Sequence, residues 1–189
     1  MFLVDQDRDD VFELYSRTVG DKQPRKLGGA LVTGGVALNS ALVVVGDVFV
    51  VSSDPYRHVR IAPDGSRVVY VADQEVDERF ELYSVPLDGS ASPVALNGAL
   101  VSGGDLATSL ERCLQISPDS NFVVYVADQR VEELSELFLA PVDGGLEPSK
   151  LNWPLAQSGV AAFEITPDSG RVVFQATERS QVTELSRAS

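Results

Sequence analysis

The sequence is poor in cysteine, histidine and basic residues. Its 189 residues include one Cys, one His, 15 Lys and Arg and 28 Asp and Glu, which gives a formal net charge of −13. The single Cys113 rules out an intramolecular disulfide. With the single His58, it also rules out a zinc site of His and Cys ligands within one chain. The deficit of Lys and Arg argues against nucleic acid and anionic membranes as partners.

Long apolar runs are also missing. The longest is Ala41–Val45 with Val48–Val51, interrupted by Gly46-Asp47, and a membrane span needs roughly 18–20 apolar residues. The first ten residues have neither the basic start nor the apolar stretch of a signal peptide. We therefore expect a soluble chain with no membrane span, whose longer parent could still have carried a leader.

Catalytic and cofactor-binding motifs are absent from the sequence. There is no Gly-x-Ser-x-Gly, no GxGxxG and no Gly-Lys-Ser/Thr. The glycine pairs, such as Gly28-Gly29, suit connections between strands for backbone reasons alone. His58 has no Ser and Asp partners at recognisable positions, and carboxylates are too abundant for any one pair to indicate glycoside cleavage. We expect a protein that is not an enzyme and has no assigned cofactor.

The sequence does contain an internal repeat of about 50 residues. Segments 61–74, 116–129 and 165–177 align, with starts 55 and 49 residues apart. A second block follows at 80–89 and 135–144, and a third at 93–97 and 149–152. The chain enters this pattern partway through, at Phe2–Gln6, and leaves it partway through, at Thr183–Ser186.

Each block predicts a short β-strand. Val68–Ala72, Phe122–Ala127 and Val172–Ala176 are rich in β-branched and aromatic residues. Pro-Asp-Gly or Pro-Asp-Ser precedes each of them and predicts a tight type I turn, so the preceding strands end at Ile61, Ile116 and Ile165. Four antiparallel strands per repeat are typical of a propeller blade. The sequence therefore predicts an all-β fold, a β-propeller of four-stranded antiparallel blades with about three and a half blades per chain.

This interpretation divides one propeller domain, 1–189, into repeats. They are a partial repeat 1–60 with an added hairpin at about 37–57, full repeats 61–115 and 116–164, and a partial repeat 165–189. Aromatic residues recur at equivalent strand positions, which predicts core packing between blades rather than a ligand platform; they are Tyr70, Tyr83, Tyr125, Phe138, Phe163 and Phe174. Cys113 lies between apolar residues, so we expect a buried, inert thiol.

The succession Ser-Pro-Asp-Gly, Val-Val-Tyr, Ala-Asp-Gln, Glu-Leu-Tyr, Asp-Gly resembles the TolB-like or PD40 class of WD40-like propeller repeats. The resemblance covers nearly the whole chain except about 20 residues near 37–57. It implies a bacterial periplasmic or secreted parent but no particular function. The repeated strands, the missing catalytic motifs and the acidic loops favour a non-enzymatic protein-interaction or ligand-binding module. Two alternatives stay open: a propeller fragment of a larger enzyme, such as a prolyl-oligopeptidase-like peptidase, and a calcium- or glycan-binding propeller.

The repeat is incomplete at both ends of the chain. The start offers second, third and outer strands, and the end offers inner, second and third strands. One chain therefore does not form a closed ring of four to eight blades. One explanation is a homodimer that completes a ring and covers open sheet edges. The other is that the chain is part of a longer one.

The loops between second and third strands are acidic, and we expect them to share a face with the Gly-rich crossovers between blades. Asp5, Asp7 and Asp9 alternate as in a calcium loop, but Asp10 and Ser16 stand where an EF-hand needs Gly and Glu. A looser calcium site stays open; its weak candidate ligands are Asp5, Asp7, Asp9, Asp73, Asp77 and Asp128. The other candidates on this binding face are Gly34, Gly35, Gly103, Gly104, Glu75, Glu78, Glu132 and Glu133.

Overall fold

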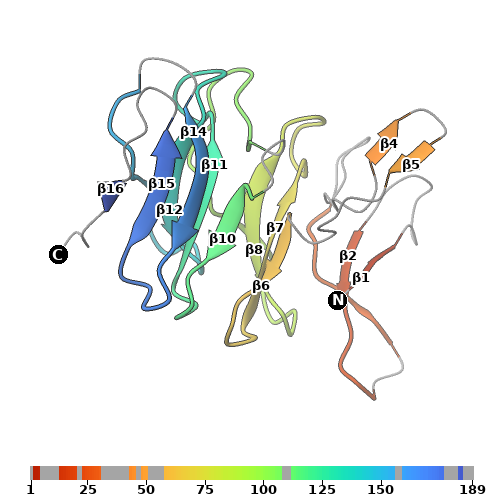
Figure 1. Cartoon of the computed structure of the whole chain (residues 1–189). Helices are drawn as coiled ribbons and strands as arrows, with labels where there is room; N and C mark the ends of the chain where they lie inside the picture. The colour runs from red at the N-terminus through yellow and green to blue at the C-terminus, as the bar shows by residue number, and fades with distance from the viewer. Residues whose placement is uncertain are drawn as a thin grey trace.

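The computed structural model of the chain describes residues 2–4, 13–20, 23–30, 43–45, 48–50, 58–107, 112–155, 159–176 and 183–184. In these ranges the regular structure consists of antiparallel β-sheets, and the four sheets of three or four strands stand side by side in the order of the sequence (Figure 1). The same ranges contain no helix long and apolar enough to cross a membrane.

Two complete sheets of four strands each form the centre of the molecule. Their strands are β6 (Val59–Ile61), β7 (Arg67–Ala72), β8 (Glu81–Pro86) and β9 (Val94–Ala95), then β10 (Leu114–Ile116), β11 (Phe122–Ala127), β12 (Glu136–Pro141) and β13 (Ser149–Lys150). Each strand pairs with the next along the chain, and the registers are equivalent: Tyr70 opposes Tyr83, and Tyr125 opposes Phe138. Such four-stranded meanders, repeated side by side, are propeller blades. The predicted fold class, an all-β partial propeller, is confirmed.

Three-stranded sheets flank the complete ones. Their strands are β1 (Phe2–Val4), β2 (Glu13–Ser16) and β3 (Arg25–Lys26) at the start, and β14 (Val160–Ile165), β15 (Val172–Ala176) and β16 (Thr183–Glu184) at the end. Within the described residues, the first sheet corresponds to second, third and outer strands, and the last to inner, second and third strands, as the repeat predicts. The exact repeat boundaries stay a prediction. A two-stranded hairpin, β4 (Val43–Val45) with β5 (Val48–Val50), lies inside the surplus segment 37–57.

The Pro-Asp turns close as the sequence predicts. The Gly65 N–H donates to the Ala62 carbonyl at 2.8 Å, and the Ala62 N–H donates to the Arg67 carbonyl at 2.9 Å. Gly65 has φ +74°, and the equivalent Ser120 and Ser169 have φ +63° and +57°. The glycine adopts this left-handed conformation without steric cost, whereas a serine there is strained.

The core lies between the sheets, because the second strands of the two complete sheets, β7 and β11, are buried on both faces. Val68, Tyr70 and Ala72 of β7 pack toward the first sheet, while Val69 and Val71 pack toward the third. This explains why these strands are continuous apolar runs rather than alternating ones. The six recurrent aromatic side chains are all buried, as is Cys113, so their predicted core positions are confirmed.

Candidate functional site

The acidic loops follow the second strands of the two complete sheets. Glu75, Asp77 and Glu78 are exposed in the first of these loops, and Glu132 and Glu133 in the second. At the fourth residue of each loop an apolar side chain is also exposed: Val76 by 48% and Val131 by 53%. Two successive blades therefore present two exposed carboxylates directly after an exposed valine, whereas the residue before the valine is Glu75 in the first loop and Arg130 in the second.

Asp73 and Asp128 begin these loops and stabilise them. Asp73 Oδ2 accepts the Glu78 N–H at 3.0 Å, and Asp128 Oδ2 accepts the Glu133 N–H at 3.0 Å. Glu78 and Glu133 have φ +63° and +59°. Each aspartate thus holds the end of its loop in a strained conformation. One oxygen of each carboxylate is engaged by the loop backbone. A role of these residues in metal ligation stays a prediction.

The Gly-rich crossover after the second sheet packs against the second acidic loop. The Val101 N–H donates to the Gln129 carbonyl at 3.1 Å. A Cβ on Gly104 would lie 2.6 Å from the Asp128 carbonyl oxygen, and a Cβ on Gly103 would collide with the Glu132 carboxylate. Only glycine permits this approach, so the predicted proximity of crossover and acidic loop is observed at this junction.

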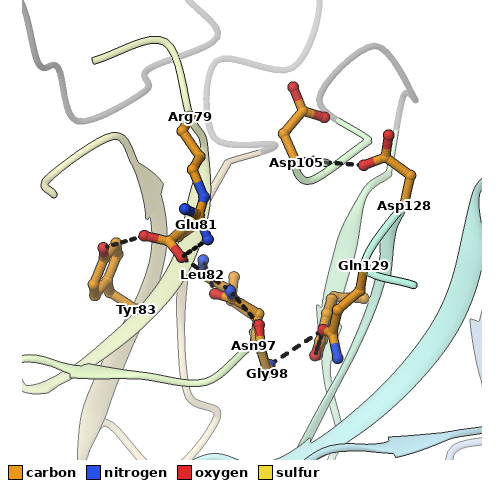
Figure 2. Close-up of polar contacts among 10 residues, drawn as sticks. Arg79, Glu81, Leu82, Tyr83, Asn97, Gly98, Asp105, Asp128 and Gln129 are labelled. Atoms are coloured by element: carbon orange, nitrogen blue, oxygen red, sulfur yellow. Dashed lines mark hydrogen bonds and ion pairs between the residues drawn. The ribbon is translucent and has the colours of Figure 1, made fainter. Parts of the chain in front are cut away.

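Asp105 ends the crossover and pairs with Asp128 (Figure 2). The Asp105 N–H donates to Asp128 Oδ1 at 2.5 Å, and the Asp128 N–H donates to the Asp105 carbonyl at 3.1 Å. Burial, and then the negative charge of Asp128, raise the pKa of Asp105 to about 6. Two carboxylates thus share the junction between crossover and loop.

A buried carboxylate, Glu81, lies beneath this face at the start of β8 (Figure 2). Tyr83 donates its hydroxyl to Glu81 Oε2 at 3.1 Å, Arg79 lies 3.5 Å from Oε1, and the Asn97 amide donates to Oε1 at 3.4 Å. Burial, together with the charge of Glu81, raises the pKa of the Tyr83 hydroxyl. The cluster ties β8 to the connection that follows β9.

Glu136 is the equivalent residue of the third sheet and has different partners. Lys150 of β13 forms an ion pair with its Oε1. Phe138 stands at the position of Tyr83, and Glu136 Oε2 is buried without a hydrogen bond. The Arg130 guanidinium lies 5.9 Å from the Phe138 ring centroid, a cation–π distance.

A glutamine links each complete sheet to the one before it. Gln74 Oε1 accepts the Tyr70 hydroxyl and the Gly29 N–H, both at 2.8 Å. Gln129 Oε1 accepts the Tyr125 hydroxyl at 3.0 Å and the Gly98 N–H at 3.1 Å. We call this arrangement the Gln–Tyr–Gly latch.

The last junction contains an aromatic contact. Trp153 stands at the position of Gly98, and Phe174 at that of Tyr125. Their ring centroids are 5.4 Å apart. An apolar contact therefore joins the third and last sheets at this position.

Two clefts lie away from the acidic loops. One, of about 650 Å³, is lined by Arg17 and Arg25 of the first sheet and by Asp88. The other, of about 490 Å³, lies between the third and last sheets beside Phe122, Leu139 and Ile165. The acidic loops line neither cleft, and small ligands prefer enclosed concave sites.

The predicted site residues divide into three groups. Asp5, Asp7, Asp9, Gly34 and Gly35 lie outside the described residues. The remaining candidates lie in the two acidic loops and in the crossover at 103–104. Among the described residues, no group of three or more His, Cys, Asp or Glu side chains is placed to hold a metal ion.

Sequence reasoning missed Asp105, Glu81 and Glu136. A signal was available for the two glutamates, because Glu-Leu-aromatic recurs in both full repeats. Nothing local marks Asp105, because its partner Asp128 lies 23 residues further along the chain. The only histidine, His58, is buried at the start of β6.

No family model matches the sequence, and no curated protein matches it either. Among solved structures, a putative TolB from Agrobacterium tumefaciens is 17% identical, with a TM-score of 0.49 over 86% of this chain and 45% of that one. TolB from Acinetobacter baumannii is 12% identical, with a TM-score of 0.49 over 97% of this chain and 40% of that one. The chain is similar in fold to both. It spans less than half of the length of either.

Proposed function

We propose that the chain is a non-enzymatic protein-interaction module that binds positively charged segments of a partner protein on its acidic loop face. The observation that carries the proposal is the recurrence, on successive blades, of two exposed carboxylates directly after the exposed Val76 and Val131. Such a surface attracts a cationic segment over a distance and offers it apolar contacts. The net charge of −13 acts in the same direction. The resemblance to periplasmic propellers supports a periplasmic or secreted setting for this function.

Binding to synthetic peptides tests the proposal. The probes are two twelve-residue peptides, one of alternating lysine and leucine and one in which glutamate replaces lysine. We expect the lysine peptide to bind the full chain with an affinity that falls as salt rises, because the attraction between exposed charges is screened. The glutamate peptide should not bind. Equal binding of the two peptides would contradict the proposal.

Charge-neutralised variants locate the binding surface. The variant E75Q/D77N/E78Q removes the exposed carboxylates of one loop and should weaken lysine-peptide binding roughly tenfold, or about 1.4 kcal/mol. The matched control is Glu147→Gln, which removes an exposed carboxylate from the connection between β12 and β13. If the control weakens binding as much as the loop variant, the interaction is a general charge effect.

A calcium titration addresses the alternative calcium-binding propeller. A ligand that binds only the native state must raise the temperature of unfolding. We expect no shift with calcium, because Asp73 and Asp128 hold their own loops. A shift of several degrees would favour the alternative.

A further inference from the structure

Asn97 lies where the chain leaves β9, and Gly98 follows it. This is the only Asn-Gly pair in the sequence. In such a pair the backbone nitrogen of the glycine can attack the side-chain amide carbon of the asparagine, because glycine has no side chain that hinders the approach. The new N–C bond replaces the bond to the amide nitrogen, which leaves as ammonia with the proton of the glycine nitrogen. Water then opens the cyclic imide to aspartate or isoaspartate. The pair therefore has the chemistry of a deamidation site.

Both reacting groups are held by hydrogen bonds in the folded chain. Asn97 Oδ1 accepts the Leu82 N–H at 2.7 Å, and Asn97 Nδ2 donates to the Gly98 carbonyl at 3.1 Å. The Gly98 N–H, whose nitrogen would attack, donates to Gln129 Oε1 at 3.1 Å (Figure 2). The side-chain amide is thus bonded within its own sheet, while the glycine nitrogen is engaged by the next sheet. Attack requires these bonds to break, so the reaction starts from a locally opened state.

The third sheet contains an equivalent asparagine that lacks the glycine. Asn152 Oδ1 accepts the Leu137 N–H at 2.7 Å, and Asn152 Nδ2 donates to the carbonyl of the following residue, Trp153, at 2.8 Å. The bonds of the side-chain amide to the backbone are therefore the same in both sheets. Because the Trp153 side chain hinders the approach of its own backbone nitrogen, Asn152 is an internal control for the effect of the glycine.

We propose that Asn97 is a deamidation site whose rate is set by the Gln–Tyr–Gly latch between the second and third sheets. Asn97 Nδ2 also donates to Glu81 Oε1 at 3.4 Å. Deamidation replaces this donor by a carboxylate oxygen beside Glu81, and the two like charges repel. Isoaspartate also lengthens the backbone before Gly98 by one carbon atom, which displaces the Gly98 N–H from Gln129 of the second acidic loop. The modification therefore loosens the junction between the two sheets.

Peptide mass mapping of the full chain, incubated at neutral pH, tests the proposal. We expect aspartate and isoaspartate to accumulate at position 97 in the folded chain, and much faster in the chain unfolded by urea. At position 152 both states should react much more slowly. Equal rates at position 97 in the folded and unfolded chains would show that the contacts do not restrain Asn97. Equal rates at positions 97 and 152 would show that the glycine is not decisive. Either result would overturn the proposal.

Two variants test the latch itself. Gln129→Leu removes the acceptor of the Gly98 N–H and should accelerate conversion at position 97 in the folded chain about tenfold, because the loss of a hydrogen bond favours the open state by about that factor. Gln74→Leu is the matched control, since it breaks the equivalent latch to Gly29 at the first junction. It should leave the rate at position 97 close to that of the wild type. If the two variants act equally, or if Gln129→Leu has no effect, the latch does not set the rate and the proposal is wrong.

The variant Asn97→Asp carries the aspartate product from the start and tests the consequence of the modification. Amide hydrogen exchange at Gly98 should be faster than in the wild-type chain at the same pH, whereas exchange at Gly29, in the equivalent latch, should not change. Unchanged exchange at Gly98 would contradict the proposed loosening of the junction. Because none of these measurements involves a partner, a failure here is distinguishable from a failure of the proposed function.

Discussion

Tyr83 and Phe138 occupy equivalent positions and differ by one hydroxyl group. That hydroxyl satisfies Glu81 Oε2 in the second sheet, and its absence leaves Glu136 Oε2 without a donor in the third. We expect Phe138→Tyr to stabilise the fold by about 1 kcal/mol and Tyr83→Phe to destabilise it by about 1–2 kcal/mol. Urea unfolding measures both changes.

A control variant separates the hydrogen bond to Glu136 from the general effect of adding a hydroxyl group to a buried ring. Phe163→Tyr adds the same group to another buried ring, away from the Glu136 carboxylate. It should be neutral or destabilising, because a buried hydroxyl without a partner costs free energy. If Phe138→Tyr destabilises the fold as much as Phe163→Tyr does, the added oxygen does not reach Glu136.

Gln129 holds the latch between the second and third sheets through a single oxygen atom. Gln129→Leu removes the acceptor of the Gly98 N–H and of the buried Tyr125 hydroxyl. The expected loss is about 2–3 kcal/mol of unfolding free energy, because two donors lose their partner. The double variant Q129L/Y125F should recover part of that loss, since it also removes the stranded hydroxyl. Additive losses in the urea-unfolding cycle would argue against the latch.

The inner-strand turns connect neighbouring sheets. The Asp64 N–H donates to the Ser120 hydroxyl at 3.0 Å, and the Asp119 N–H donates to the Ser169 hydroxyl at 3.0 Å. Each of these serines has a left-handed backbone conformation, which costs free energy. The hydrogen bond explains why serine stands in the third and last sheets at the turn position that Gly65 occupies in the second sheet.

Two substitutions at Ser120 separate the bond from the strain. Ser120→Ala removes the acceptor and keeps the strained backbone, so we expect a loss of about 1 kcal/mol. Ser120→Gly removes both, and the two effects should nearly cancel. Thermal unfolding distinguishes the variants, with glycine the more stable of the two. The same stability for both would mean that the left-handed conformation at 120 carries no cost.

The strands and turns were predictable because their signals are local. Apolar runs such as Phe122–Ala127 and the Pro-Asp turns appear within a few residues, and the repeat shows each signal again. The loop carboxylates were less predictable. Glu75 is exposed as expected, but Asp73 holds its own loop, and Asp105 depends on a partner in the next sheet. Unlike the recurrent Gln–Tyr–Gly latch, the contact between Asp105 and Asp128 leaves no periodic pattern in the sequence.

The first and last sheets each end in a strand whose equivalent in the complete sheets is internal. Within the described strands, β1 lies at the edge of its sheet, although the equivalent β7 lies between two strands. Likewise β16 lies at an edge, whereas the equivalent β12 is internal. Strand edges of this kind pair readily with other chains, and natural proteins cover or block them. Such edges fit both explanations that the sequence leaves open: two copies that complete a ring, and a chain that is part of a longer one. We propose the first as the one that can be tested on this chain.

Sedimentation equilibrium tests that association. Because one chain has a mass of 20.3 kDa, the homodimer proposal predicts twice that mass at micromolar concentration. Val4→Lys places a charge on the β1 edge and should shift the population toward single chains, because edge lysines oppose strand pairing. Glu147→Gln lies away from both edges and should leave the mass unchanged. A stable, soluble protein of 20.3 kDa would refute the dimer.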